Sequence, residues 1–126
     1  MQGETSITNK TNGTLPRVPF ARIKDAILGS SYSLSVAIVP PRESHRLNLA
    51  FRGKDNPTNV LSFPYSEQSG ELVLDLTTSK EQAPDFNMPF TRFITYLVIH
   101  GMLHLKGMDH GSTMEREEKK FLKIFS

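Results

Sequence analysis

Apolar and polar residues follow two repeating patterns along the chain, one typical of helices and one typical of strands. In "VPFARIKDAILG", residues 18–29, apolar residues recur at helical spacing, which predicts a helix that ends at Gly29. In "SLSVAIVP", residues 33–40, apolar residues occupy alternate positions, which predicts a strand. A second helix is expected from about Glu43 to Arg52, where Gly53 ends it.

The middle of the chain holds two further short apolar runs. The runs are "NVLSFP", residues 59–64, and "ELVLDL", residues 71–76. The turn-rich segment "YSEQSG" separates them, so we expect two strands joined as a hairpin. A weaker strand candidate lies at Thr5–Thr8, before a segment of turn residues.

A long apolar segment follows, and its pattern predicts a buried helix. Residues 90–106 are apolar on most helical faces, which is typical of a central helix. Asn87 is a candidate N-cap, Pro89 fits the first turn, and Gly107 is a stop signal.

The last helix is expected from Ser112, because Glu115 follows at the spacing of a capping box. Together these elements predict an α+β fold, with a small mixed sheet of about four strands covered by helices. The long helix of residues 90–106 is expected to lie across one face of that sheet.

Composition narrows the class of protein. With 126 residues, 37% hydrophobic and 22% charged, the chain favours one globular domain over residues 1–126. Cysteine is absent, which excludes thiolate zinc sites, disulfides and cysteine nucleophiles. The sequence has neither the apolar core of a signal peptide nor an apolar run long enough to span a bilayer. We therefore expect a cytoplasmic protein without a membrane partner.

The net charge of +2 is unevenly distributed. Residues 1–60 carry eight basic and four acidic side chains, whereas residues 61–126 carry seven and nine. This asymmetry permits a basic face for RNA, and it equally permits an ordinary solvated surface.

The clearest chemical signal is "HGMLHLKGMDH", residues 100–110, which contains three of the four histidines. His100 and His104 are one helical turn apart and can bind the same ion. Gly107 can turn the chain so that His110 supplies a third ligand. Three imidazoles with an open fourth position are typical of a catalytic zinc site, so we predict one zinc ion per chain.

Several other residues are open to a structural or a functional interpretation. A lone histidine on an apolar helix is usually a hydrogen-bonded core residue, and His45 is interpreted as a surface residue. Asp109 either orients a metal ligand or caps the last helix. Zinc peptidases share the spacing but carry a catalytic glutamate where this chain has Gly101. A peptidase-like hydrolase is therefore the second hypothesis.

The histidine motif resembles the HGxLHLxGxDH signature of the YbeY family, the metal-dependent endoribonucleases of bacterial ribosomal-RNA maturation. The segment "FRGKDNPTNVLSFP", residues 51–64, is similar to a second segment of that family. The resemblance implies a sheet with surrounding helices, zinc on His100, His104 and His110, and RNA as the substrate. It also implies ribosomal RNA and the small ribosomal subunit as partners, and it points to Arg52 as an active-site residue. Because the sequence departs from the family pattern near Asn59 and Asp75, no role is carried over to them.

The chemistry of Arg52 agrees with this implication, because a guanidinium binds two phosphate oxygens with a planar fork. The resulting hypothesis is metal-assisted cleavage of an RNA phosphodiester, with zinc activating water or polarising a phosphoryl oxygen. For Thr58 and Ser62, hydrogen bonds to the backbone are favoured over phosphate contacts. A third hypothesis is a non-catalytic ribosome-assembly factor with structural zinc, although three ligands argue against a closed structural site.

Overall fold

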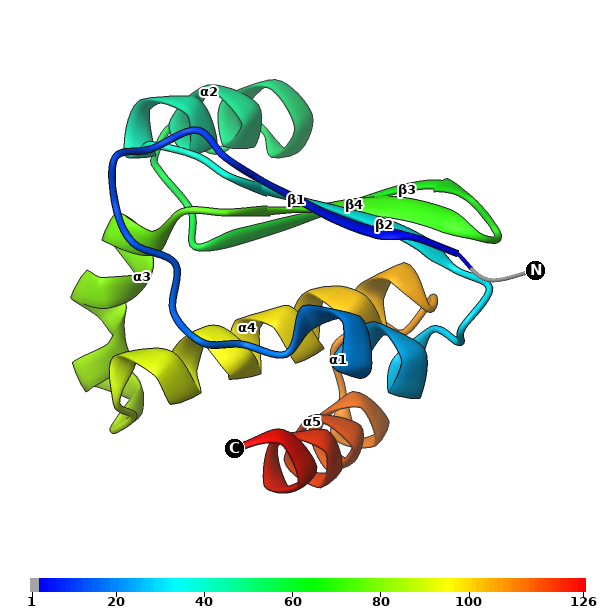
Figure 1. The fold of residues 1–126 in the computed structure, drawn as a ribbon. Coiled ribbons are helices and arrows are strands. Elements are labelled where there is room, and N and C mark those ends of the chain that lie inside the picture. Colours follow the sequence, from blue (N-terminus) through cyan, green and yellow to red (C-terminus); the bar gives the residue numbers. More distant parts are fainter. Residues whose placement is uncertain (1–2) are drawn as a thin grey trace.

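The computed structural model describes residues 3–126 and contains a four-stranded sheet with helices on both faces (Figure 1). The elements in chain order are β1 (Thr5–Asn9), α1 (Phe20–Ile27), β2 (Ser33–Ile38), α2 (Pro41–Arg52), β3 (Val60–Ser66), β4 (Ser69–Leu74), α3 (Leu76–Gln82), the short 3-10 helix η1 (Ala83–Phe86), α4 (Phe90–Leu105) and α5 (Ser112–Phe125). None of these helices is long and apolar enough to cross a membrane.

The sheet is mixed, and its strand order is β1-β2-β4-β3. Strand β2 pairs in parallel with both β1 and β4, whereas β3 and β4 form the expected antiparallel hairpin. The predicted α+β fold with a small mixed sheet is therefore confirmed. Because β3 is the last strand in the order, one of its two edges has no neighbouring strand among the described residues.

The strands bury different side chains on their two faces. On one face, residues such as Leu34, Val36 and Leu72 belong to the main core, together with buried residues of α1, α4 and α5. On the other face, Leu61 and Val73 belong to a smaller cluster, against which Leu47 of α2 packs. Figure 1 shows α2 on this side of the sheet. The alternation of side chains along a strand produces this division, because successive residues point to opposite faces.

Helix α4 is the central helix, as the apolar pattern predicts. Figure 1 shows that it runs along the sheet, with α1 beside it and α5 on the side away from the sheet. Phe93, Ile94, Ile99, Met102 and Leu103 are completely buried in it. Each such side chain contributes roughly 1.5–3 kcal/mol through burial, so the position of α4 is strongly determined.

Two predicted helix caps are wrong. The N-cap of α4 is Pro89, because Asn87 instead adopts a left-handed conformation with φ of 54° and ends η1. The capping box of α5 does not form, because Ser112 is already inside the helix and Gly111 is its N-cap.

Helix α3 and η1 were not predicted, since their residues lack an apolar stripe. Helix α3 begins with a strong cap, because the buried carboxylate of Asp75 accepts hydrogen bonds from Thr78 N and Thr78 Oγ1 at 2.8 and 2.7 Å. Asp75 also accepts a 2.7 Å hydrogen bond from Ser44 Oγ in α2. This residue therefore anchors two helices to the end of β4.

Candidate functional site

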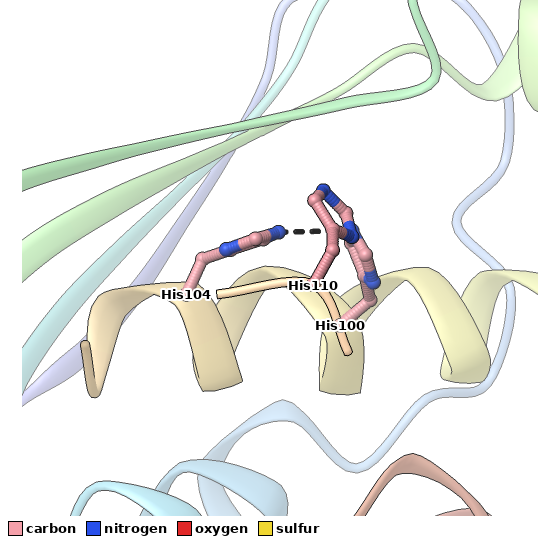
Figure 2. Close-up of side chains that lie close together, drawn as sticks. All are labelled: His100, His104 and His110. Carbon is pink, nitrogen blue, oxygen red and sulfur yellow. Dashed lines mark hydrogen bonds between the residues drawn. The ribbon is translucent and has the colours of Figure 1, made fainter. Parts of the chain in front are cut away.

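Three histidine side chains converge beside α4. His100 and His104 lie one turn apart on α4, and His110 lies in the segment between α4 and α5 (Figure 2). Gly107 adopts a left-handed conformation with φ of 103°, which turns the chain after the helix as predicted. Each histidine offers one ring nitrogen to a cluster in which these atoms all lie within 4.8 Å of one another.

The rings of His100 and His104 are held by hydrogen bonds through their Nδ1 atoms. His104 Nδ1 donates to the carbonyl oxygen of Met108 at 2.9 Å, because a carbonyl can only accept. His100 Nδ1 contacts Glu118 Oε2 at 2.5 Å. Both contacts leave the Nε2 atoms facing each other at 3.2 Å, as Figure 2 shows.

This geometry fits a metal ion. Two imidazole nitrogens at 2.0–2.1 Å from a tetrahedral zinc would lie about 3.3–3.4 Å apart, close to the observed Nε2–Nε2 distance. Burial lowers the pKa of His104 below its usual value, and the nearby rings of His100 and His110 lower it further. The hydrogen bond to Met108 and the charge of Asp109 act in the opposite direction but are outweighed. His104 is therefore held in the neutral form that binds metal.

The carboxylate that orients a histidine is Glu118, which the sequence analysis did not identify. Glu118 lies on α5 and is only 7% exposed. The pKa of the neighbouring Tyr96 hydroxyl is raised mainly by its own burial, and the charge of Glu118 raises it further. A sequence signal for Glu118 exists, because it occupies the same helical stripe as the buried Met114, Phe121 and Leu122.

Asp109 has neither of the two roles considered for it. Among residues 3–126 no hydrogen bond joins Asp109 to a histidine ring, and the N-cap of α5 is Gly111. Asp109 is exposed and influences His104 only through its charge. His45 lies apart from the cluster, on α2, where its Nε2 contacts Asp55 Oδ1 at 2.6 Å.

A cleft of about 570 Å³ joins the histidine cluster to the segment of residues 51–64. Its lining consists of Phe51, Arg52, Thr58, Asn59, Val60, Leu61, Ser62, Phe63 and the three histidines. Consecutive residues of a strand point to opposite faces, so a cleft that contacts all of residues 60–63 follows the strand's edge. The cleft therefore runs along the unpaired edge of β3.

Arg52 reaches this cleft from the last turn of α2. The helix ends there because Gly53 adopts a left-handed conformation with φ of 68°. Arg52 is exposed, and no acidic group within residues 3–126 forms an ion pair with it. Its guanidinium is therefore available for an anion that enters the cleft.

Gly101 lies where α4 approaches the sheet most closely. A Cβ atom at this position would be 2.7 Å from Leu72 Cδ2 and 3.1 Å from Ser62 Oγ. Ser62 Oγ also donates a 3.0 Å hydrogen bond to the carbonyl oxygen of Gly101, as expected for a backbone contact. Because the position has no room for a side chain, it cannot hold the glutamate on which a zinc peptidase depends.

The remaining polar residues of the cleft have contacts within the fold. The backbone N–H of Thr58 donates to Ser44 Oγ at 3.3 Å. Asn59 Nδ2 donates to Gln82 Oε1 at 2.7 Å, which ties β3 to the end of α3. The side chain of Asn59 is thus hydrogen-bonded to Gln82, a contact that the sequence pattern did not predict.

Comparison with known proteins relates this arrangement to one family. The structure is similar to the solution structure of TM1509 from Thermotoga maritima, with a TM-score of 0.68 and 29% sequence identity. The match covers 94% of this chain and 87% of that protein. A family model described as "Endoribonuclease YbeY" matches residues 4–124, which include Arg52 and all three clustered histidines. This chain belongs to the YbeY endoribonuclease family.

Proposed function

We propose that this chain is a zinc-dependent endoribonuclease that cleaves single-stranded RNA in the cytoplasm during ribosomal-RNA processing. The small ribosomal subunit is the partner that we propose for it. The observation that carries the proposal is the cleft, where Arg52 and the three-histidine cluster line the same space. Membership of an endoribonuclease family supports RNA as the substrate.

His100, His104 and His110 would hold the zinc ion, because their ring nitrogens are close together and two of the rings are oriented by hydrogen bonds. When bound, zinc would supply Lewis-acid chemistry for phosphodiester cleavage. Imidazole also suits copper, iron and nickel, so zinc is the part of the proposal that metal analysis must test. The three histidines leave room for a further ligand in an open cleft, which is typical of catalytic rather than structural sites.

Arg52 would bind the phosphate of the bond to be cleaved. Its planar guanidinium can donate two hydrogen bonds to non-bridging oxygens and offset the negative charge that develops on them. The cleft is open to solvent water, and within residues 3–126 its lining contains no carboxylate that could act as a general base. The alternative hypothesis of a peptidase lacks support, because Gly101 packs so closely against Leu72 that no glutamate side chain fits there.

The test is cleavage of a defined single-stranded RNA by zinc-loaded protein, followed by identification of the product end groups. We expect internal cleavage of the single strand, slower cleavage of the same sequence in a duplex, and no cleavage of casein. Protein stripped by a chelator should be inactive and should recover with zinc. A His104→Ala variant purified in parallel controls for contaminating nucleases, and equal RNA loss with this variant would contradict the proposal.

A further inference from the structure

An exposed aromatic ring, that of Phe51, lines the cleft next to Arg52, the residue proposed to bind phosphate. Phe51 precedes Arg52 in the last turn of α2 and is 66% exposed, yet it lines the cleft. Single exposed apolar residues are common on protein surfaces and need no explanation by themselves. Phe51 differs because it shares one cleft with the guanidinium of Arg52 and the three clustered histidines.

The ring of Phe51 is held in place from one side. Phe63 on β3 contacts it edge to face, with ring centroids 5.2 Å apart and an interplanar angle of 70°. Phe63, like Leu47 of α2, packs against the cluster that includes Leu61. The half-buried ring of Phe63 therefore supports the ring of Phe51, whose remaining surface faces solvent.

The chemistry around this ring favours a nucleobase as its occupant. Proteins that bind unpaired RNA combine cationic groups for the backbone with aromatic rings on which bases stack. Arg52 supplies the cation here, and Phe51 supplies the ring. A volume of about 570 Å³ is within the roughly 300–1,000 Å³ typical of ligand pockets, which leaves room for a base beside the phosphate.

We propose that Phe51, braced by Phe63, is a stacking subsite for an unpaired base of the RNA, next to the phosphate at Arg52. This inference rests on the proposed ribonuclease function and identifies a cause for single-strand preference. In a duplex both faces of each base are covered by neighbouring bases, so a paired base cannot stack on Phe51 unless it leaves the helix. Stacking tolerates any base, so the subsite selects for unpaired RNA and not for a sequence.

The experiment compares zinc-loaded wild type with Phe51→Leu, which keeps apolar volume but removes the aromatic face, and with Phe51→Trp, which keeps it. On a single-stranded RNA we expect Phe51→Leu to lower kcat/KM by about 5- to 150-fold, the equivalent of ~1–3 kcal/mol for one stacked base. Phe51→Trp should stay close to wild type. Tyr65→Leu is the matched control, because Tyr65 is 65% exposed on β3 but does not line the cleft.

A second arm uses RNAs in which one nucleotide at a time lacks its base. In the wild type, one position near the cleaved bond should show a clear loss of kcat/KM. In Phe51→Leu the same abasic position should cost nothing further, because both changes remove one contact. An identical abasic profile in both proteins, or a Phe51→Leu variant as active as wild type, would overturn the subsite.

The outcome also separates this subsite from the proposed function. If zinc-loaded wild type cleaves no RNA, the nuclease proposal fails, and the affinities of wild type and Phe51→Leu for the same single strand still test stacking. If Phe51→Leu cleaves and binds free RNA normally but acts poorly on ribosomal subunits, the ring contacts a protein instead and the base-stacking proposal is wrong.

Discussion

His104 is one of two clustered histidines whose Nδ1 is held by a hydrogen bond, in its case to Met108, and its pKa is lowered mainly by burial. We predict that His104→Ala removes most of the bound zinc, measured by metal analysis after gel filtration. His45→Ala is the control, because His45 contacts Asp55 on the surface of α2. Zinc content equal to wild type in the His104 variant would be incompatible with the site.

The lowered pKa of His104 also determines a pH dependence. Protons compete with metal for imidazole, so zinc affinity should weaken as the pH falls below about 6. In the metal-free protein, the unfolded chain binds a proton at His104 before the native chain does, since the native pKa is lower than the unfolded value. Stability is therefore full above the unfolded value of 6.5 and falls as the pH drops toward the native pKa.

The side chain of Arg52 contributes little to the stability of the fold, since it is exposed and forms no ion pair among residues 3–126. We predict that Arg52→Ala retains zinc and stability but loses about a hundred- to a thousand-fold in RNA cleavage, the usual cost of removing a strong electrostatic donor. Arg52→Lys should recover little, because an ammonium cannot donate as a planar fork. Single-turnover cleavage alongside zinc analysis measures both properties, and wild-type rates in Arg52→Ala would remove its proposed role.

The contact between α4 and the sheet depends on Gly101. An alanine there would bring its Cβ to 2.7 Å from Leu72, which is fully buried and cannot move freely. Overpacking typically costs about 1–3 kcal/mol, while alanine in a helix recovers up to about 1 kcal/mol relative to glycine. We therefore expect Gly101→Ala to lower the free energy of unfolding in urea. Gly13→Ala, where the new Cβ meets only Thr11 Oγ1 at 3.6 Å, should leave it nearly unchanged.

The packing of α5 against α4 brings Glu118 to His100. Glu118→Gln keeps the shape but removes the charged acceptor that orients this ring. Loss of such a partner typically reduces metal affinity by about 10- to 100-fold. We expect this loss in a chelator-competition titration, whereas Glu117→Gln should behave as wild type because Glu117 pairs with Lys120 on the surface. Equal affinities in the two variants would show that Glu118 has no orienting role.

The molecule as a whole buries both sheet faces with helices from all parts of the chain, including α1 near its beginning and α5 at its end. We therefore predict that residues 1–126 unfold as one domain, in a single urea transition followed by both tyrosine fluorescence and circular dichroism. Zinc at about a hundred times its Kd should raise the free energy of unfolding by roughly 2.7 kcal/mol, because only the folded chain gathers the three histidines. Two separated transitions would argue for more than one domain.

Local patterns were sufficient for much of this protein. The fold class, the β3–β4 hairpin, the central helix and the turn at Gly107 follow from periodicity and glycine positions, because these depend on neighbouring residues. The approach of His100 to His104 is equally local, since helical geometry brings residues four apart together. Helix α3 was missed because its residues lack an apolar stripe. Asp75, which caps α3 through Thr78, is also held by Ser44, a contact that joins residues 31 positions apart.

The candidate site required contacts between distant segments. Glu118 reaches His100 only because α5 packs on α4, and Arg52 lines the histidine cleft only because β3 is the last strand of the sheet. The family resemblance pointed to Arg52 without explaining how it comes near the clustered histidines. Spacing along the chain cannot supply such information, because strand order and helix docking are determined by which apolar faces are buried against each other. That burial also leaves Phe51 exposed in the cleft and Gly101 without room for a side chain.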